Sequence, residues 1–257
     1  MRLDVHAWGA PDAPPVVCLH GVTGHGGRFR DLAADHLPAR RVLAPDLRGH
    51  GASGWDPPWD IPTHLADVIE TLDAAGLGER PLDFVGFSFG GRLTLELAAR
   101  EPNRVRRMAL VDPAIQIPPP KAREFADATR PDVPFRSVDE AVARRIQFAP
   151  AGDRRMIEAD AREALVAGED GLLRYRYSAS AVIAAYGEMA HEPPPVARVP
   201  ILLVRAETGI VEDAHEALLR EAAGTLLEVL RVPCGHSVLW EAYEATGAAV
   251  AAFLGRP

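Results

Sequence analysis

Short apolar runs alternate along the chain with longer segments in which apolar residues recur every three or four positions. The short runs are rich in Val, Leu and Phe and almost continuous in hydrophobicity, which is typical of strands covered on both faces. We therefore predict strands at Pro15–Leu19, Val42–Ala44, Leu82–Phe87, Val105–Val111, Ile201–Arg205 and Leu227–Val232.

The longer segments have the periodicity of amphipathic helices. In Ile61–Ala75 the apolar residues form an i, i+3, i+4, i+7 stripe, and Pro62 stands near the start, where its restricted φ suits a helix. Phe89–Arg100 repeats this pattern, and a last helix is predicted at Leu239–Leu254. The alternation predicts an α/β fold, a mostly parallel sheet with helices on both faces.

The alternation is interrupted once, between Asp112 and Val199, where no segment is a convincing strand. Helices are predicted in this interval near Val138–Phe148, Arg154–Ala167 and Ala179–Met189. A helical insertion between two strands most simply forms a lid over the carboxyl edge of the sheet. The expected division is a core of residues 1–112 and 198–257 with a helical lid, or cap, of residues 113–197.

Composition narrows the class of protein. The chain has 257 residues, 47% hydrophobic and 25% charged, with a formal net charge of −8. This apolar content excludes a disordered chain, and the length suits one large domain. No apolar stretch approaches the roughly 18 residues of a membrane span, and no signal peptide is evident, so we expect a cytoplasmic protein without membrane contact. The absence of a Lys/Arg block argues against nucleic acid and leaves a small-molecule substrate.

Two cysteines, Cys18 and Cys234, are too few for a disulfide scaffold, and Cys18 lies inside an apolar run where a buried thiol is the simpler interpretation. The nine histidines include neither an H-E-x-x-H motif nor a cluster with zinc spacing. We therefore expect no metal.

The clearest chemical signal is the segment Gly86–Gly90, with the sequence G-F-S-F-G. It follows a predicted strand directly and opens a predicted helix, which is the context of a G-x-S-x-G nucleophile elbow. A serine on so tight a turn needs glycine two positions away on either side. Ser88 is therefore the candidate nucleophile, and the N–H of Phe89, at the helix N-terminus, is a candidate oxyanion donor.

A serine hydroxyl needs a base, and His236 is the best candidate because it lies between the last predicted strand and the last predicted helix. His20 occupies an equivalent loop after Pro15–Leu19, but a glycine-containing segment follows it. That loop is better interpreted as supplying a second oxyanion donor, the N–H of Val22.

Four motifs in this order resemble the α/β-hydrolase fold superfamily over essentially the whole chain. His20-Gly21 is similar to its HG oxyanion motif, and Asp46–Ser53 (D-L-R-G-H-G-A-S) to its D-x-R-G-x-G-x-S loop. Gly86–Gly90 is similar to its elbow, and Gly235-His236 to its catalytic histidine. The resemblance implies an eight-stranded sheet, a lid inserted after the sixth strand, and hydrolysis through a Ser/His/acid triad without a cofactor.

The acid of the triad is open at this point. In many relatives it follows the strand equivalent to Ile201–Arg205, but Gly209 stands about there in this chain. Asp112, directly after Val105–Val111, is the preferred candidate because some members of the superfamily use that position. Glu207 is the alternative, and Asp213 is a further possibility.

The nucleophile separates the subclasses of the resembled superfamily, since relatives that open epoxides or displace halide use aspartate at the elbow. Ser88 favours acyl transfer to water, through an acyl-enzyme. The pocket residues are predicted to be Phe87, Trp55, Trp59 and Phe148. Such a pocket suits a neutral ester or lactone of a small, largely apolar substrate.

Two other functions are considered beside the ester or lactone hydrolase. One is a carbon–carbon bond hydrolase of vinylogous diketones, because Cys234-Gly235-His236 with Trp240-Glu241 also resembles those enzymes. The other is a non-catalytic small-molecule binder, which the intact Ser88 and His236 disfavour.

Overall fold

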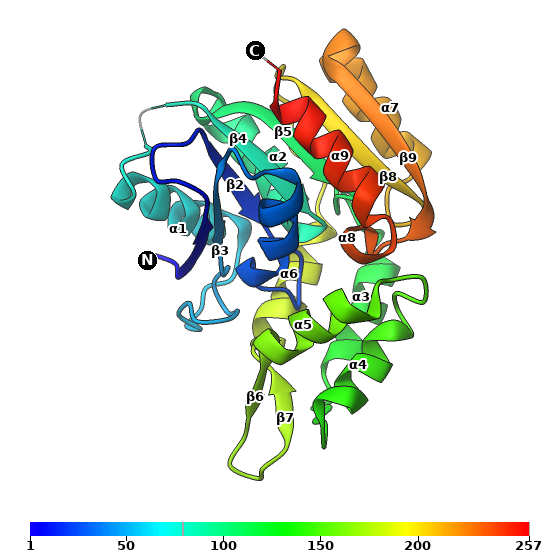
Figure 1. Ribbon diagram of the computed structural model, residues 1–257. Coiled ribbons are helices and arrows are strands. Elements are labelled where there is room, and N and C mark those ends of the chain that lie inside the picture. The colour runs from blue at the N-terminus through cyan, green and yellow to red at the C-terminus, as the bar shows by residue number, and fades with distance from the viewer. Residues whose placement is uncertain (79, 257) are drawn as a thin grey trace.

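The computed structural model describes residues 1–78 and 80–256 and has a main β-sheet at its centre (Figure 1). Within the described residues this sheet has seven strands in the order β1-β3-β2-β4-β5-β8-β9. Only β1 is antiparallel to its neighbour, β3. The strands are β1 (Val5–Trp8), β2 (Pro15–Leu19), β3 (Arg41–Pro45), β4 (Leu82–Phe87), β5 (Val105–Val111), β8 (Ile201–Thr208) and β9 (Leu227–Gly235).

All six predicted strands of the sheet are confirmed, and β1 is an addition. The pattern of β1, V-H-A-W, is short and half-buried at the sheet edge, so it lacks the continuous hydrophobicity of the inner strands. The expected count of eight differs from the seven observed. The additional strands of the described chain, β6 (Leu165–Ala167) and β7 (Leu173–Tyr175), pair with each other and not with this sheet.

Helices cover both faces of the sheet, as the alternation predicts. Side chains of α1, α2 and α7 share one hydrophobic cluster with the sheet, and α9 and the helical turn Leu32–His36 share another on the opposite face. The helices are α1 (Ile61–Ala74), α2 (Phe89–Arg100), α3 (Pro119–Thr129), α4 (Val138–Ile146), α5 (Arg154–Ala164), α6 (Ala179–Met189), α7 (Asp213–Ala223), α8 (Val238–Glu241) and α9 (Tyr243–Leu254).

The helices differ from the sequence prediction in two ways. The pattern does not predict α3 and α7, because each buries few apolar residues and so lacks a continuous stripe. The predicted helix Leu239–Leu254 is two helices, α8 and α9, separated at Ala242, whose φ of −130° and ψ of 38° are not helical.

Residues 113–197, the cap segment, connect β5 to β8 and contain α3, α4, α5, α6 and the β6–β7 ribbon. Figure 1 shows them gathered beyond one end of the sheet. The prediction that this interval contains no strand is wrong for β6 and β7. Each has only three residues, without a fully buried side chain, and therefore leaves no hydrophobic signal.

The topology determines where a site can form. β3 and β4 lie on opposite sides of β2, so the loops after β2 and β4 leave the sheet in opposite directions and open a crevice at their carboxyl ends. Separately, none of the described helices combines the length and apolar character needed to cross a membrane.

Candidate active site

Ser88 stands on the tight turn between β4 and α2. Its φ of 53° and ψ of −116° lie in a region of backbone conformation that residues other than glycine rarely adopt. The flanking glycines are required by space, since a Cβ would lie 2.0 Å from the Leu19 carbonyl oxygen at Gly90 and 2.6 Å from the Gly90 carbonyl oxygen at Gly86. The turn holds the hydroxyl at the carboxyl edge of the sheet.

His236 follows the end of β9, and its ring lies between Ser88 and Asp112. Its Nε2 is 3.0 Å from Ser88 Oγ, and its Nδ1 is 2.6 Å from Asp112 Oδ2. With Nδ1–H donating to the carboxylate, Nε2 is free to accept from the serine hydroxyl. The imidazole also stacks on Phe87, with ring centroids 5.1 Å apart, which restricts its rotation.

Asp112 is fully buried at the end of β5, with a φ of 38°. Besides His236, its carboxylate accepts the N–H of Ala206 at 3.2 Å and the N–H of Ile210 at 3.1 Å. Gly209 is packed against this carboxylate, because a Cβ there would lie 2.3 and 2.4 Å from the two oxygens. The glycine on the β8 loop therefore leaves room for an acid that comes from β5.

The other two candidate acids lie elsewhere. Glu207 is exposed at the end of β8, and no contact between it and His236 is found in the described residues. Asp213 is 95% exposed and pairs with Arg205. The suggestion of Glu207 as an alternative acid is corrected by this geometry, since Asp112 occupies the Nδ1 side of the histidine.

The loop after β2 lies against Ser88. A Cβ on Gly21 would come within 2.8 Å of the Ser88 Cβ, so only glycine allows this approach. Val22 follows Gly21 in this loop and lines the same cavity as Ser88. Phe89 is the first residue of α2, so its N–H has no partner within the helix. These are the two predicted oxyanion donors.

His20 holds this loop through two hydrogen bonds. Its Nδ1 donates to the Gly21 carbonyl at 2.8 Å, and its Nε2 accepts the Leu47 N–H at 2.9 Å. Burial, together with the neighbouring His50, holds the pKa of His20 well below its ordinary value, so the ring is neutral. A neutral imidazole is what one donated and one accepted bond require.

The Asp46–Ser53 loop is fastened in turn by its own motif residues. The Asp46 carboxylate accepts the N–H groups of Gly26 and Ala52 at 2.7 and 2.8 Å. Burial alone would raise the pKa of Asp46, but the hydrogen bond from His6 and these N–H groups bring it below its ordinary value. Arg48 binds Asp67 through two hydrogen bonds, at 2.7 and 2.8 Å. This motif therefore supports the His20 loop and does not reach Ser88 itself.

Ser88 and His236 open into a cavity of about 460 Å³, the Ser88 cavity. Its lining is Val22, Thr23, Arg28, Phe87, Ser88, Ile117, Phe125, Ala128, Thr129, Arg144, Arg145, Phe148, Tyr186, Met189, Ile210, His236, Ser237, Leu239 and Trp240. Half of its wall comes from the sheet loops and half from the cap segment.

Of the four predicted pocket residues, Phe87 and Phe148 line the Ser88 cavity and Trp55 and Trp59 do not. The prediction is wrong for the two tryptophans because their loop folds back on itself. The indole N–H of Trp55 donates to Gly51, and the Trp59 indole lies against Gly49.

The Ser88 cavity is not apolar throughout, which also departs from the sequence prediction. Ile117, Phe125 and Met189 contribute hydrocarbon surface, and burial raises the pKa of Tyr186 to about 12, so its phenol stays neutral. Arg144 and Arg145 also line it, from the end of α4. Sequence reasoning missed this pair, although it stands three and four positions before the predicted pocket residue Phe148.

Away from Ser88, two groups of side chains have the composition of a metal site. One is His6, His25 and Glu163, and the other is Asp4, His6 and Asp46. Neither includes Ser88 or His236. Three of their members already have partners outside the groups: His25 contacts Asp160 at 3.1 Å, Glu163 contacts Arg30 at 2.7 Å, and Asp46 accepts the N–H groups of Gly26 and Ala52.

Comparison with known proteins agrees with the fold. Residues 14–147 match the α/β-hydrolase fold family. Lipase LipV of Mycobacterium tuberculosis is 36% identical over 245 residues, which cover 93% of each chain. The 2-hydroxymuconate semialdehyde hydrolase of a Pseudomonas species is 29% identical over 85% of this chain and 72% of its own. The crystal structure of E-2-(acetamidomethylene)succinate hydrolase superposes with a TM-score of 0.84, over 99% of this chain and 95% of that one, at 24% identity.

Proposed function

This chain is a hydrolase of the α/β-hydrolase fold family, and from that premise we propose that it cleaves a carboxylic ester or lactone through Ser88, His236 and Asp112. The observation that supports this most is the continuous hydrogen-bonded chain from Ser88 Oγ through His236 to a buried carboxylate. The similarity of this chain to a protein named as a lipase, over almost the full length of both chains, favours an ester as the substrate.

In the first half of the reaction, Ser88 Oγ attacks the carbonyl carbon while His236 Nε2 takes the hydroxyl proton. The Asp112 carboxylate holds the Nδ1–H and stabilises the imidazolium that forms. The N–H groups of Val22 and Phe89 bind the oxyanion of the tetrahedral intermediate. His236 then gives its proton to the departing alkoxide, which leaves an acyl group on Ser88.

In the second half, water enters the Ser88 cavity and His236 removes one of its protons. The hydroxide attacks the acyl carbon, the same two N–H groups bind the oxyanion, and Ser88 leaves with the proton from His236. The products are a carboxylic acid and an alcohol, or a single hydroxy acid if the substrate is a lactone. No step requires a cofactor.

The cap segment acts in this proposal as the lid that selects the substrate. Phe125, Tyr186 and Met189 project from it into the Ser88 cavity, opposite the residues of the sheet loops. Hydrocarbon parts of a substrate would pack against this surface while the carbonyl reaches Ser88.

The test is hydrolysis of p-nitrophenyl esters of increasing acyl length by the wild type and by Ser88→Ala. Loss of this serine is expected to lower kcat by on the order of 10⁶-fold, with the free energy of unfolding nearly unchanged. Turnover that survives Ser88→Ala in a homogeneous preparation would contradict the proposal.

A carbon–carbon bond hydrolase is the second candidate. It is favoured by the similarity to a hydrolase whose named substrate is a semialdehyde, not an ester. Hydrolysis of a vinylogous diketone, followed by its loss of absorbance, separates the two. Cleavage of the diketone with a kcat/KM above that of every ester tested would favour the second candidate.

A further inference from the structure

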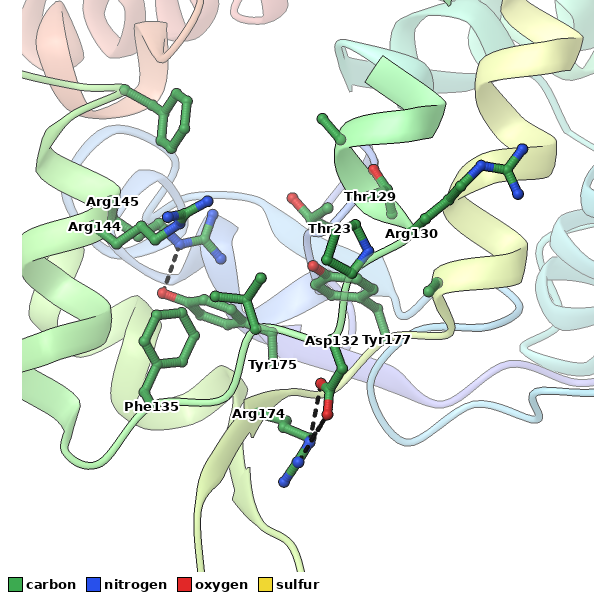
Figure 2. Close-up of a pocket in the computed structure, with 15 residues that line it drawn as sticks. Thr23, Thr129, Arg130, Asp132, Phe135, Arg144, Arg145, Arg174, Tyr175 and Tyr177 are labelled. Atoms are coloured by element: carbon green, nitrogen blue, oxygen red, sulfur yellow. Dashed lines mark hydrogen bonds and ion pairs between the residues drawn. The ribbon is translucent and has the colours of Figure 1, made fainter. Parts of the chain in front are cut away.

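A second hollow, of about 350 Å³, shares lining residues with the Ser88 cavity. Figure 2 shows the residues that line it. It lies between α3, α4 and β7, and we call it the outer hollow. Residues that line both spaces are Thr23, Ala128, Thr129, Arg144, Arg145 and Phe148. The two spaces are therefore neighbours, and Arg144 and Arg145 stand at their shared wall.

The charge of the Ser88 cavity is opposite to that of the chain. The chain carries a formal net charge of −8, yet the described lining of this cavity includes three arginines and no aspartate or glutamate. One buried carboxylate, Asp160, lies behind the lining and serves two of the three. It binds Arg28 through hydrogen bonds of 2.9 and 3.3 Å and lies 3.6 Å from Arg145.

Arg145 is held in place by contacts on two sides. Its Nε donates to the Tyr175 hydroxyl at 3.0 Å, and its guanidinium lies over that ring at 4.2 Å from the centroid. Its buried Nη2 lies 3.6 Å from Asp160 Oδ2, an ion pair that is longer than a hydrogen bond. These contacts fix the guanidinium at the wall of the Ser88 cavity, where its charge can attract an anion.

Arg144 differs from the other arginines of the outer hollow. Its side chain is exposed, and within the described part of the chain it has no ion pair or hydrogen bond. Arg130 pairs with Asp127, and Arg174 pairs with Asp132 and Asp170. In Figure 2, Arg144 and Arg145 lie side by side, whereas Arg130 extends away from them.

Basic residues in the last turn of a helix are common because they face its carbonyl end. That alone would not account for a pair that lines the cavity of the candidate nucleophile, where the described lining contains no carboxylate and Arg144 has no ion pair among the described residues. The arrangement matches the way proteins bind carboxylate or phosphate oxygens with guanidinium groups.

We propose that the substrate carries an anionic group, a carboxylate or a phosphate, at the end remote from its scissile ester, and that Arg144 and Arg145 bind it. This rests on the proposed function of Ser88. The apolar wall holds the hydrocarbon between the two ends, and the arginine pair selects acyl chains long enough to span from Ser88 to the end of α4. The pair is a specificity determinant and takes no part in bond cleavage.

The experiment compares p-nitrophenyl hemiesters of dicarboxylic acids with p-nitrophenyl esters of monocarboxylic acids of the same chain length. At the chain length that spans the cavity, the hemiester should have the higher kcat/KM. Arg144→Gln should lower kcat/KM for that hemiester by about 10- to 100-fold, mainly through KM, because a hydrogen bond to a charged group is lost. Because Arg144 also lines the Ser88 cavity, the rate with the neutral ester should change as well, but by a smaller factor, so the readout is the ratio of the two kcat/KM values.

Arg144→Lys keeps the positive charge and should retain part of the preference for the hemiester. Arg130→Gln is the control, because Arg130 pairs with Asp127 and does not line the Ser88 cavity, and it should leave the kcat/KM for the hemiester unchanged. Binding of glutarate and of inorganic phosphate, measured by calorimetry, needs no turnover and separates carboxylate from phosphate. The inference would be overturned if neutral esters were preferred at every length, if Arg144→Gln left the hemiester rate unchanged, and if no anion bound. Ser88-dependent turnover in the same experiments would still uphold the proposed function. Absence of any Ser88-dependent turnover would instead contradict the proposed function, and calorimetry alone would then decide whether the anion site exists.

Discussion

The sheet edge and the cap segment meet at the Ser88 cavity, but they are built differently. At the sheet edge, Ser88 is 4% exposed and Asp112 fully buried, and their hydrogen bonds and strained backbones leave little freedom. In the cap segment, α3 buries only Ala122, and Phe148 is 68% exposed where it lines the cavity. The cap segment has only a small core of its own, which it completes with Trp240 from the other side.

This difference separates reaction from recognition. The groups proposed to carry the reaction sit at strand ends, where the hydrogen bonds of the sheet hold their backbone in place. The cap residues that line the Ser88 cavity, and that we propose contact the rest of the substrate, sit on short helices with few buried residues, where local stability is low. We therefore expect changes at the sheet edge to lower kcat, and changes in the cap segment to alter stability or substrate preference.

After replacement of Ser88 itself, the largest effect on kcat should come from Asp112→Asn at the sheet edge. The amide cannot accept the Nδ1–H in the same way, so His236 adopts the wrong tautomer, and kcat for p-nitrophenyl esters should fall by about 10⁴-fold. Glu207→Gln, the matched change at an exposed carboxylate, should leave kcat unchanged. If the two variants exchanged these results, the acid would have to be reassigned.

Asp160→Asn should have the largest effect on stability, because Asp160 joins the cap segment to the core. Burial alone would raise the pKa of Asp160, but Arg28 and Arg145 hold it well below its ordinary value, so the group is charged. Its replacement leaves two buried guanidiniums without a carboxylate and should lower the free energy of unfolding by about 3–5 kcal/mol.

The matched control for this variant is Asp170→Asn, at an exposed ion pair of the β6–β7 ribbon. We expect a change within about 0.5 kcal/mol there, because water screens exposed pairs. Urea unfolding measures both variants, and equal losses would mean that the buried network does not hold the two regions together.

Gly209→Ala tests how tightly the sheet edge is packed. The new Cβ would overlap both oxygens of Asp112 and push the carboxylate away from His236, so kcat should fall by about 10²-fold. Gly187→Ala in the cap segment places a Cβ in open space within α6. It should leave kcat unchanged and raise stability by up to about 1 kcal/mol. Similar kinetics for the two variants would contradict the distinction drawn above.

A further prediction is a dependence of stability on pH that originates in buried histidines near the sheet edge. Burial lowers the pKa values of His50 and His64 to about 4. Between about pH 6.5 and pH 4 these histidines bind protons in the unfolded chain but not in the folded chain. The free energy of unfolding therefore falls as the pH falls, by up to about 1.4 kcal/mol per pH unit for each histidine. Denaturation midpoints measured across this range check the slope, which His64→Phe should reduce and which would be absent if the rings were solvated.

The sequence alone determined six of the seven strands of the main sheet, the flanking helices α1 and α2, and the Ser88 turn. These are local features. A buried strand can be recognised from a run of about six apolar residues, and the elbow from Gly86–Gly90. His236 could be predicted for a related reason, because the loop after the last strand of a parallel sheet must emerge at the same edge as Ser88. Short or polar elements such as β6, β7 and α7 bury too little to leave a pattern.

Only the tertiary structure decided which carboxylate meets His236 and what lines the cavity. Asp112 and His236 are 124 positions apart, and their contact depends on whether another loop leaves space, which Gly209 does. Trp55 and Trp59 are large and aromatic in sequence, yet their loop turns them away, while Arg144 and Arg145 reach the cavity from a helix 56 and 57 positions after Ser88. The direction of a loop follows from the packing of segments distant in sequence, and no local pattern encodes it.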